Sequence, residues 1–316
     1  MARAMGGRTG TSGAGRRAAT LLAAVGVTAM VACAGTATPG ARSGFAPTRI
    51  LDVDQGVDEL AADGSRAAFL WAGHSVDDWD VRTGKRRHQV DNDDLLSDLV
   101  IADGVFGYLQ FAHSITIQFR AVVTWPLAGD KAGFSVAADL ECARTCLGYL
   151  AGHGDLLVYN SWQNSPRGIE KAVLWRIVGT RHSSPRLGPF WRRYRFAHPV
   201  RTIRLGGESV SALLPQAIVV LDRRTGAQKR SWRVPKQTRL EDVAGGFVVY
   251  IVGQQIHVRR LADGRDRVVP LPDNARAPVH AQLELSGLFY SWTLPPEGDG
   301  RLAFAPMSRV AALFGA

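Results

Sequence analysis

The residues best suited to chemistry are carboxylates, arginines and a histidine that recur a few positions ahead of small-residue turns. Carboxylate and imidazole groups brought to one place could hold a metal ion or a polar ligand. The same groups would equally keep a water-filled channel solvated. Which of these two roles applies depends on the elements that position the side chains. The candidate binding residues are Asp58, Glu59, Asp98, Arg239, Glu241, Asp242 and His280, with Arg204 and Gln282 in equivalent places.

Signatures of catalysis are missing from the sequence. It contains no nucleophile elbow, HExxH, P-loop or dinucleotide fingerprint in a strand–turn–helix context. The eight histidines are scattered, and no two have helical metal-ligand spacing. Two acidic stretches, "DVDQGVDE" (52–59) and "DNDD" (91–94), lack the glycine and distal glutamate of an EF-hand loop and are interpreted as solvated loops. We therefore expect no catalytic residues, no cofactor and no metal site.

The sequence contains three cysteines, whose positions help to indicate the cellular compartment and any cross-link: Cys33, Cys142 and Cys146. The pair in "ECARTC" indicates either a local disulfide or half of a metal site. Zinc usually takes four ligands, no second cysteine pair exists, and the nearest further ligand is His153 in a turn. We predict a Cys142–Cys146 disulfide.

The first forty residues are typical of an export signal. A basic, glycine-rich start precedes "AATLLAAVGVTAMVACAG", an apolar run too short for an ordinary membrane span. The sequence "ACA" around Cys33 fits a cleavage site, "MVAC" resembles a lipobox that would lipidate Cys33, and an uncleaved run could act as an anchor. We predict a signal over 1–34, a flexible linker over 35–46 and one domain over 47–316. The protein is then exported to the cell envelope or beyond, with membrane attachment through its N-terminus among the alternatives.

The charge of +10 does not by itself indicate a nucleic-acid binder, because five arginines and no acidic residue lie in residues 1–44. The densest basic and aromatic stretch is "FWRRYRF" (190–196). Such interleaving can stack bases and hold phosphates, but a strand with partly packed rings and solvated arginine heads is the favoured interpretation. No nucleic-acid motif accompanies it. We expect a monomer that does not bind nucleic acid.

The elements that position these residues follow from a repeat of about 40 to 53 residues. In each repeat an alternating apolar run, a small-residue turn and a second apolar or aromatic run predict a β-hairpin. Several repeats add a third run, a turn and a fourth run, as in "VDDWDVRTGKRR" and "AIVVLDRRTGAQKRSWRV". The six turns are Asp63-Gly64, Asp103-Gly104, His153-Gly154, Gly206-Gly207, Gly245-Gly246 and Ser286-Gly287.

Four strands in 40 to 50 residues are the unit of a β-propeller blade. A β-sandwich also needs short strands but does not require the same pattern to recur. We predict an all-β propeller of six blades, with a seventh hidden in 129–148 or 180–200 as the alternative. The last repeat, from Val279, has three strands, and Thr48 to Val53 forms a spare one. We expect this N-terminal strand to close the ring, with Ile50 and either Leu51 or Val53 buried.

The segments "VDDWDVRTG", "KAVLWRIVG" and "AIVVLDRRTG" resemble the third strands of WD-type and TolB-like propeller repeats. The resemblance covers about residues 46 to 310. More narrowly, "LEDVAGGFVVYIVGQQIHVRRLADGRD" followed by "VHAQLELSGLFYSW" is similar to a group of exported actinobacterial propeller-like proteins with no assigned activity. In propellers the innermost strands line the central channel, and this would gather the candidate residues there.

Two functions fit these observations. The first is a non-catalytic module of the cell envelope that binds a protein, peptide or glycan at a propeller mouth. The second is a secreted hydrolase or lyase with a polar site at the channel mouth. The lack of a catalytic constellation favours the first, although the fold class alone cannot decide between them.

Overall fold

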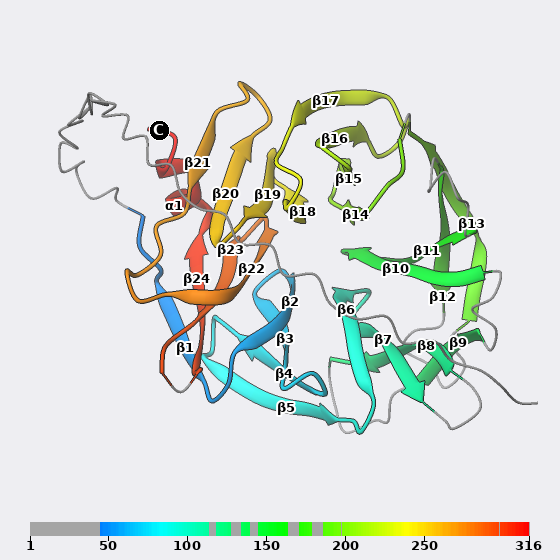
Figure 1. Cartoon of the computed structure of the whole chain (residues 1–316), viewed down its shortest axis with the longest axis horizontal. Coiled ribbons are helices and arrows are strands. Elements are labelled where there is room, and N and C mark those ends of the chain that lie inside the picture. The colour runs from blue at the N-terminus through cyan, green and yellow to red at the C-terminus, as the bar shows by residue number, and fades with distance from the viewer. Residues whose placement is uncertain are drawn as a thin grey trace, which may run out of the picture. The chain divides into compact units, whose positions relative to one another are not determined.

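The chain folds as a six-bladed β-propeller of antiparallel four-stranded sheets (Figure 1). The computed structural model describes residues 45–113, 118–127, 134–139, 145–163, 171–178, 186–196, 198–296 and 298–315. Blade 1 consists of β2 (Val57–Asp63), β3 (Arg66–Trp71), β4 (Ser75–Asp80) and β5 (Lys85–Asp91). Blade 2 consists of β6 (Leu95–Ala102), β7 (Val105–His113), β8 (Gln118–Pro126) and β9 (Phe134–Asp139). Blade 3 consists of β10 (Thr145–His153), β11 (Leu156–Gln163), β12 (Lys171–Val178) and β13 (Arg186–Arg195). Blade 4 consists of β14 (Thr202–Leu205), β15 (Ser209–Leu214), β16 (Ala217–Asp222) and β17 (Gln228–Arg233). Blade 5 consists of β18 (Arg239–Ala244), β19 (Phe247–Val252), β20 (Gln255–Arg260) and β21 (Asp266–Val268). Blade 6 consists of β22 (Arg276–Glu284), β23 (Gly287–Thr293), β24 (Gly300–Pro306) and β1 (Arg49–Val53).

Each of the six predicted turns lies where the first strand of a blade passes into the second, which confirms the repeat. Glycine is needed where the turn requires a left-handed backbone. Gly64, for example, has φ = +59° and Gly246 has φ = +81°, values that other residues adopt only at a cost. The innermost strands contact one another in the order β2, β6, β10, β14, β18, β22 and back to β2, and so line the centre of the ring.

The ring is closed by the N-terminal strand, as predicted. β1 pairs antiparallel with β24, with Arg49 opposite Phe304 and Val53 opposite Gly300. Val53 is only 1% exposed and packs between blades 6 and 1. The expected burial of Ile50 is wrong, since its side chain is 54% exposed. Side chains alternate along a strand, so Ile50 points to the face opposite Val53, where no neighbouring blade covers it.

The core of the propeller is divided among the six interfaces between neighbouring blades. One cluster of buried apolar residues lies at each interface, for example Phe69, Trp79 and Val81 of blade 1 against Phe289 and Phe304 of blade 6. The described parts of 129–148 and 180–200 supply β9, the start of β10 and β13 to blades 2 and 3. The seven-blade alternative is therefore wrong.

Two features at the ends of the described chain were not expected. Phe45 is buried and its ring lies 6.1 Å from that of Tyr290. A short helix, α1 (Met307–Ala312), follows the last strand, and Val310 and Phe314 pack into the core between blades 5 and 6. Within the described residues, no helix has both the length and the apolar character to cross a bilayer.

Several predictions concern residues outside the described part of the chain. The signal and Cys33 lie there, as does Cys142. Cys146 is the second residue of β10, but its side chain is not among those described. The stretch "FWRRYRF" does form a strand, β13, in which Tyr194 is 2% exposed and Trp191 is half-buried, so the strand interpretation is confirmed.

Candidate binding pocket

All candidate residues of the channel lie on innermost strands, as the repeat predicts. A β-bulge interrupts five of these strands near the end at which each begins. In β18 the bulge falls between Leu240 and Asp242 and sets Glu241 out of register. Both acidic side chains accept hydrogen bonds from the backbone of the neighbouring innermost strand, β22. Bulges re-aim side chains in this way and free backbone groups for new partners.

The carboxylates of the channel are bonded to the backbone of the next blade. Glu59 accepts a hydrogen bond from the backbone N–H of Leu99 (2.7 Å), and Asp242 accepts one from Leu283 (2.8 Å). Arg204 donates through Nε to the Glu241 carbonyl at 2.8 Å. These bonds join adjacent blades where the bulges leave backbone groups unpaired, and each satisfies a polar group that would otherwise be buried alone.

Burial dominates the electrostatics of this region. It raises the pKa of Asp242 to about 7 and, together with the charges of Asp242 and Asp63, the pKa of Glu284 to about 8. Burial, followed by the charge of Arg239, lowers the pKa of His280 to about 3. At neutral pH Glu284 is therefore mainly protonated and His280 is neutral.

The channel cavity is small. It is lined by all six innermost strands, yet its volume is only about 30 Å³, enough for about two water molecules. Asp58 lies apart from it, with an exposed carboxylate that accepts a hydrogen bond from the Gly73 N–H at 2.7 Å. Arg239 is 48% exposed and pairs with Glu241 at 3.2 Å, and Asp98 is half-buried with a left-handed backbone (φ = +54°). Within the described residues, no group of three or more His, Cys, Asp or Glu is arranged to hold a metal ion.

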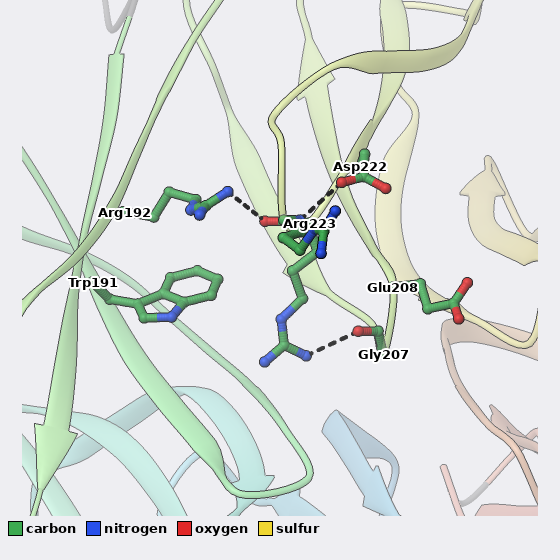
Figure 2. Close-up of a pocket in the computed structure, with 7 residues that line it drawn as sticks. Trp191, Arg192, Gly207, Glu208, Asp222 and Arg223 are labelled. Atoms are coloured by element: carbon green, nitrogen blue, oxygen red, sulfur yellow. Dashed lines mark hydrogen bonds between the residues drawn. The ribbon is translucent and has the colours of Figure 1, made fainter.

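A much larger pocket lies between blades 3 and 4, away from the predicted residues (Figure 2). Its volume is about 610 Å³, well within the usual range for ligand sites. Trp191 and Arg192 come from β13, Gly207 and Glu208 from the turn after β14, and the rest from the end of β16 and the turn that follows it. The lining residues are Trp191, Arg192, Gly207, Glu208, Asp222, Arg223 and Arg224.

Arg223 occupies a position that recurs around the ring. In five blades the first residue after the third strand donates its N–H, over 2.8 to 3.1 Å, to a carbonyl in the turn between the first two strands. This residue is apolar in four blades and packs into the interface with the preceding blade. Only in blade 4, among these five, is it charged. The five residues are Val81, Leu127, Arg223, Leu261 and Met307.

The carbonyl at this position is also held by the preceding blade. Arg192 donates to the Arg223 carbonyl at 3.0 Å, just as Arg66 donates to Leu127 at 3.0 Å and Arg230 to Leu261 at 3.1 Å. Tyr194 adds a second donor to the Arg223 carbonyl at 2.9 Å. Arg192 therefore joins two blades, and its guanidinium is engaged within the protein.

The side chain of Arg223 enters the pocket and does not fill the interface. Its guanidinium carbon lies 5.5 Å from the centre of the Trp191 ring, within cation–π range. One guanidinium nitrogen, Nη1, donates to the carbonyls of Gly206 (3.0 Å) and Gly207 (3.3 Å). Burial lowers the pKa of Arg223, but an arginine remains charged at any physiological pH. The pocket thus holds a pre-oriented, partly desolvated cation.

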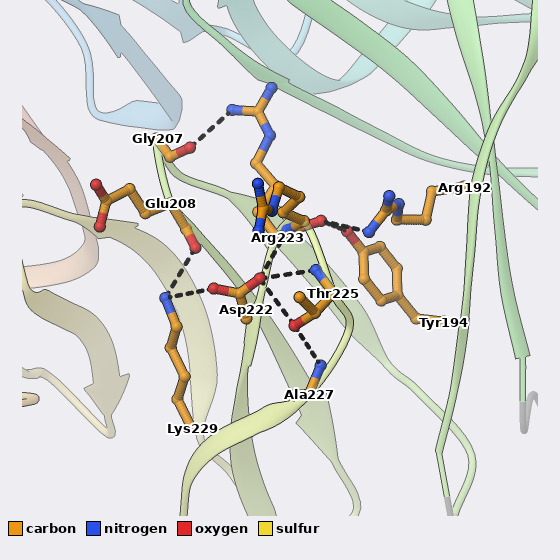
Figure 3. A network of polar contacts seen from close by, with 10 residues as sticks. Arg192, Tyr194, Gly207, Glu208, Asp222, Arg223, Thr225, Ala227 and Lys229 are labelled. Carbon is orange, nitrogen blue, oxygen red and sulfur yellow. Dashed lines mark hydrogen bonds and ion pairs between the residues drawn. The ribbon is translucent and has the colours of Figure 1, made fainter.

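The turn that carries Arg223 is fixed by Asp222 (Figure 3). Its carboxylate accepts bonds from the Thr225 N–H at 2.7 Å and hydroxyl at 2.9 Å, and from the Arg224 N–H at 3.0 Å. Lys229 pairs with the other oxygen at 3.1 Å. The bonds from Thr225 and Lys229 hold the pKa of Asp222 well below its usual range. Asp222 therefore acts within the turn, and Glu208 is the exposed acid of the pocket wall.

Sequence reasoning missed this pocket although its signal was present. The turns "DVRTG" (80–84) and "DRRTG" (222–226) differ at one residue, and "FWRRYRF" supplies the tryptophan. These segments were interpreted as two turns and a strand, and their backbones do have these conformations. Their meeting at one interface depends on ring geometry, which no local pattern contains.

No family model matches the sequence, and no curated protein matches it. Among solved structures, a chain of the "Crystal Structure of Mitotic Checkpoint Complex" is 12% identical, with 84% of this chain and 96% of that chain covered and a TM-score of 0.48. The structure "Kluyveromyces lactis Hsv2 complete loop 6CD" is 13% identical, with 77% and 90% covered and a TM-score of 0.42.

Proposed function

We propose that this protein is an exported, envelope-associated propeller that binds a partner without chemical turnover, and that the partner occupies the pocket between blades 3 and 4. One observation carries the proposal. Four of the five blade interfaces compared above place an apolar side chain at a position where the fifth places Arg223, beside a cavity of about 610 Å³. The position that holds a packed apolar side chain in the other four compared blades therefore holds a charged side chain at a pocket in blade 4.

The central channel supports the same proposal by contrast. Its carboxylates are bonded to backbone N–H groups across blade boundaries, and its volume leaves room for little but water. These residues join blades, while the pocket between blades 3 and 4 is wide enough for part of a protein, peptide or glycan. Export and envelope association rest on the signal-like segment and on "MVAC".

Site-specific cross-linking in the cells that make the protein tests the site. A photo-reactive p-benzoylphenylalanine replaces Arg224 in one variant and Arg82 in a matched one, because Arg82 holds the equivalent position in the blade 1 turn and its side chain is 77% exposed. Arg223 is retained in both variants, and covalent capture accumulates even where the loss of the Arg224 charge weakens binding, so we expect a discrete adduct from position 224 and none from position 82. Adding Arg223→Leu should abolish the adduct. Equal labelling at both positions, or none at 224, would refute the proposed site.

Localisation is tested separately by cell fractionation of the full chain. We expect recovery in the envelope fraction, and loss of membrane retention in Cys33→Ser if the residue is lipidated. Recovery of the whole protein in the cytosol would refute export. Retention unchanged in Cys33→Ser would leave export intact and exclude lipidation as the anchor.

A further inference from the structure

We infer that the pocket between blades 3 and 4 recognises an acidic residue in a peptide segment of the partner protein. The inference rests on the proposed function and names the chemistry of its ligand. The carboxylate would pair with the guanidinium groups of Arg223 and Arg224, and the adjoining peptide N–H groups or a basic side chain would face Glu208.

The first support is the donor set that Arg223 presents. Nη1 is bonded to Gly206 and Gly207, whereas Nε and Nη2 meet no acceptor within the described part of the chain. A guanidinium with two donors left over has the planar fork that matches a carboxylate. Trp191 supports the guanidinium from one side at 5.5 Å, so the fork does not have to be ordered when the ligand binds.

The second support is the distribution of charge across the pocket. Figure 2 shows Trp191 and Arg192 on one side, Gly207 and Glu208 on the other, and the Arg223 side chain between them. Arg192 is engaged with the Arg223 carbonyl and Asp222 with Lys229 and Thr225. A bond to a carbonyl does not neutralise a guanidinium, so the charges left for a ligand are three cations, Arg192, Arg223 and Arg224, and one anion, Glu208.

This mixed charge selects among the classes of anion. A nucleic acid or an anionic membrane presents dense negative charge, which would meet Glu208 as well as the arginines. A peptide combines an isolated carboxylate with N–H donors within a few ångströms, which suits both walls at once. A pocket of about 610 Å³ also accommodates a side chain together with its flanking backbone.

Selection from a library of random heptapeptides tests the inference with the full-length protein as bait. We expect enrichment of peptides with an Asp or Glu followed by a basic residue. The selected peptide, labelled with fluorescein, should lose about tenfold or more in affinity when its acid is replaced by the matching amide. The same loss is expected in Arg224→Gln, an exposed position whose substitution leaves the turn's backbone bonds in place.

The control is Arg82→Gln, the equivalent substitution in the blade 1 turn, which should bind the peptide as the unmodified protein does. The inference is overturned if no acidic peptide is enriched, or if Arg82→Gln weakens binding as much as Arg224→Gln. It is also overturned if phosphatidylglycerol vesicles, and not peptides, bind in an Arg224-dependent way. If position 224 forms an adduct in cells but the selected peptides show no preference for an acidic residue, the proposed function stands and only this inference is refuted.

Discussion

Blade 1 and blade 4 contain the same turn and use it differently. In both, an aspartate at the end of the third strand accepts the N–H two residues on at 3.0 Å, and the glycine N–H returns to the aspartate carbonyl at 2.8 Å. The residue after the aspartate is Val81 in one blade and Arg223 in the other. Val81 is 6% exposed among the rings of blades 6 and 1, whereas Arg223 lies beside an open pocket.

This difference shows how a repeat acquires a site without a change of fold. The hydrogen bonds that make the turn involve the aspartate, threonine and glycine, so the side chain between them is free to vary. An apolar side chain there packs the interface with the preceding blade. An arginine leaves a cavity and presents a charge, at some cost in packing.

Removing β1 tests the packed interface of blades 6 and 1, and it should lower the unfolding free energy more than any substitution considered. Deletion of residues 46–54 takes away Val53 from the interface of blades 6 and 1, together with the whole pairing with β24. Burial of one such side chain and several strand hydrogen bonds together contribute about 5 kcal/mol. Urea unfolding should show a loss of that size and an increased tendency to aggregate.

Deletion of 36–44, the predicted linker, is the matched control and should leave the unfolding midpoint unchanged. If both truncated proteins unfold with the midpoint of the intact chain, ring closure by β1 does not stabilise the propeller.

Val81→Arg transfers the blade 4 residue into the blade 1 turn. The guanidinium would enter a packed apolar interface with no space prepared for it, so we expect a loss of about 3 kcal/mol in unfolding free energy. Arg82→Gln at the exposed neighbouring position should change stability by less than about 0.5 kcal/mol. A Val81→Arg protein as stable as the parent would mean that any blade interface accepts this arginine.

The interface of blades 6 and 1 also predicts a pH dependence, through Glu284. Its pKa rises from 4.5 in the unfolded chain to about 8 in the folded protein because the carboxyl is buried. Between these values the unfolded chain loses the proton that the folded one keeps, so the unfolding free energy falls as pH rises, by about 5 kcal/mol.

Glu284→Gln removes this slope. The variant should be more stable than the parent at pH 9 and should lose that advantage at pH 4, as measured by urea unfolding at both values. An advantage of equal size at both pH values would show that Glu284 is not protonated in the folded state.

Much of the fold was predictable because its signals are local and repeated. Each turn shows in the sequence as a small residue between apolar runs, and the spare strand at one end matches the missing strand at the other. Ile50 was not predictable, since alternation alone does not say which face of an edge strand is covered. The short helix α1 carries too few residues for a helical period to show.

The site was less predictable, for a physical reason. Polar residues on innermost strands were expected to gather, and they do, but their hydrogen bonds to neighbouring backbone could not be foreseen because bulges set their direction. Arg223 is identified only when its turn is superimposed on the others and its neighbour across the interface, Trp191, is known.

The unfolding free energy of Arg223→Leu is the most direct test of the central claim, that this position gives up packing in order to bind. Leucine is the residue that blades 2 and 5 place there. Against Trp191 it should restore an apolar contact. Gly207 is exposed on the pocket wall, and water that replaces the longer arginine side chain can bond to its carbonyl and to that of the buried Gly206. We predict a variant that is at least as stable as the parent, by up to about 1 kcal/mol. A loss of more than about 1 kcal/mol would contradict the account, because Arg223 would then be serving the fold.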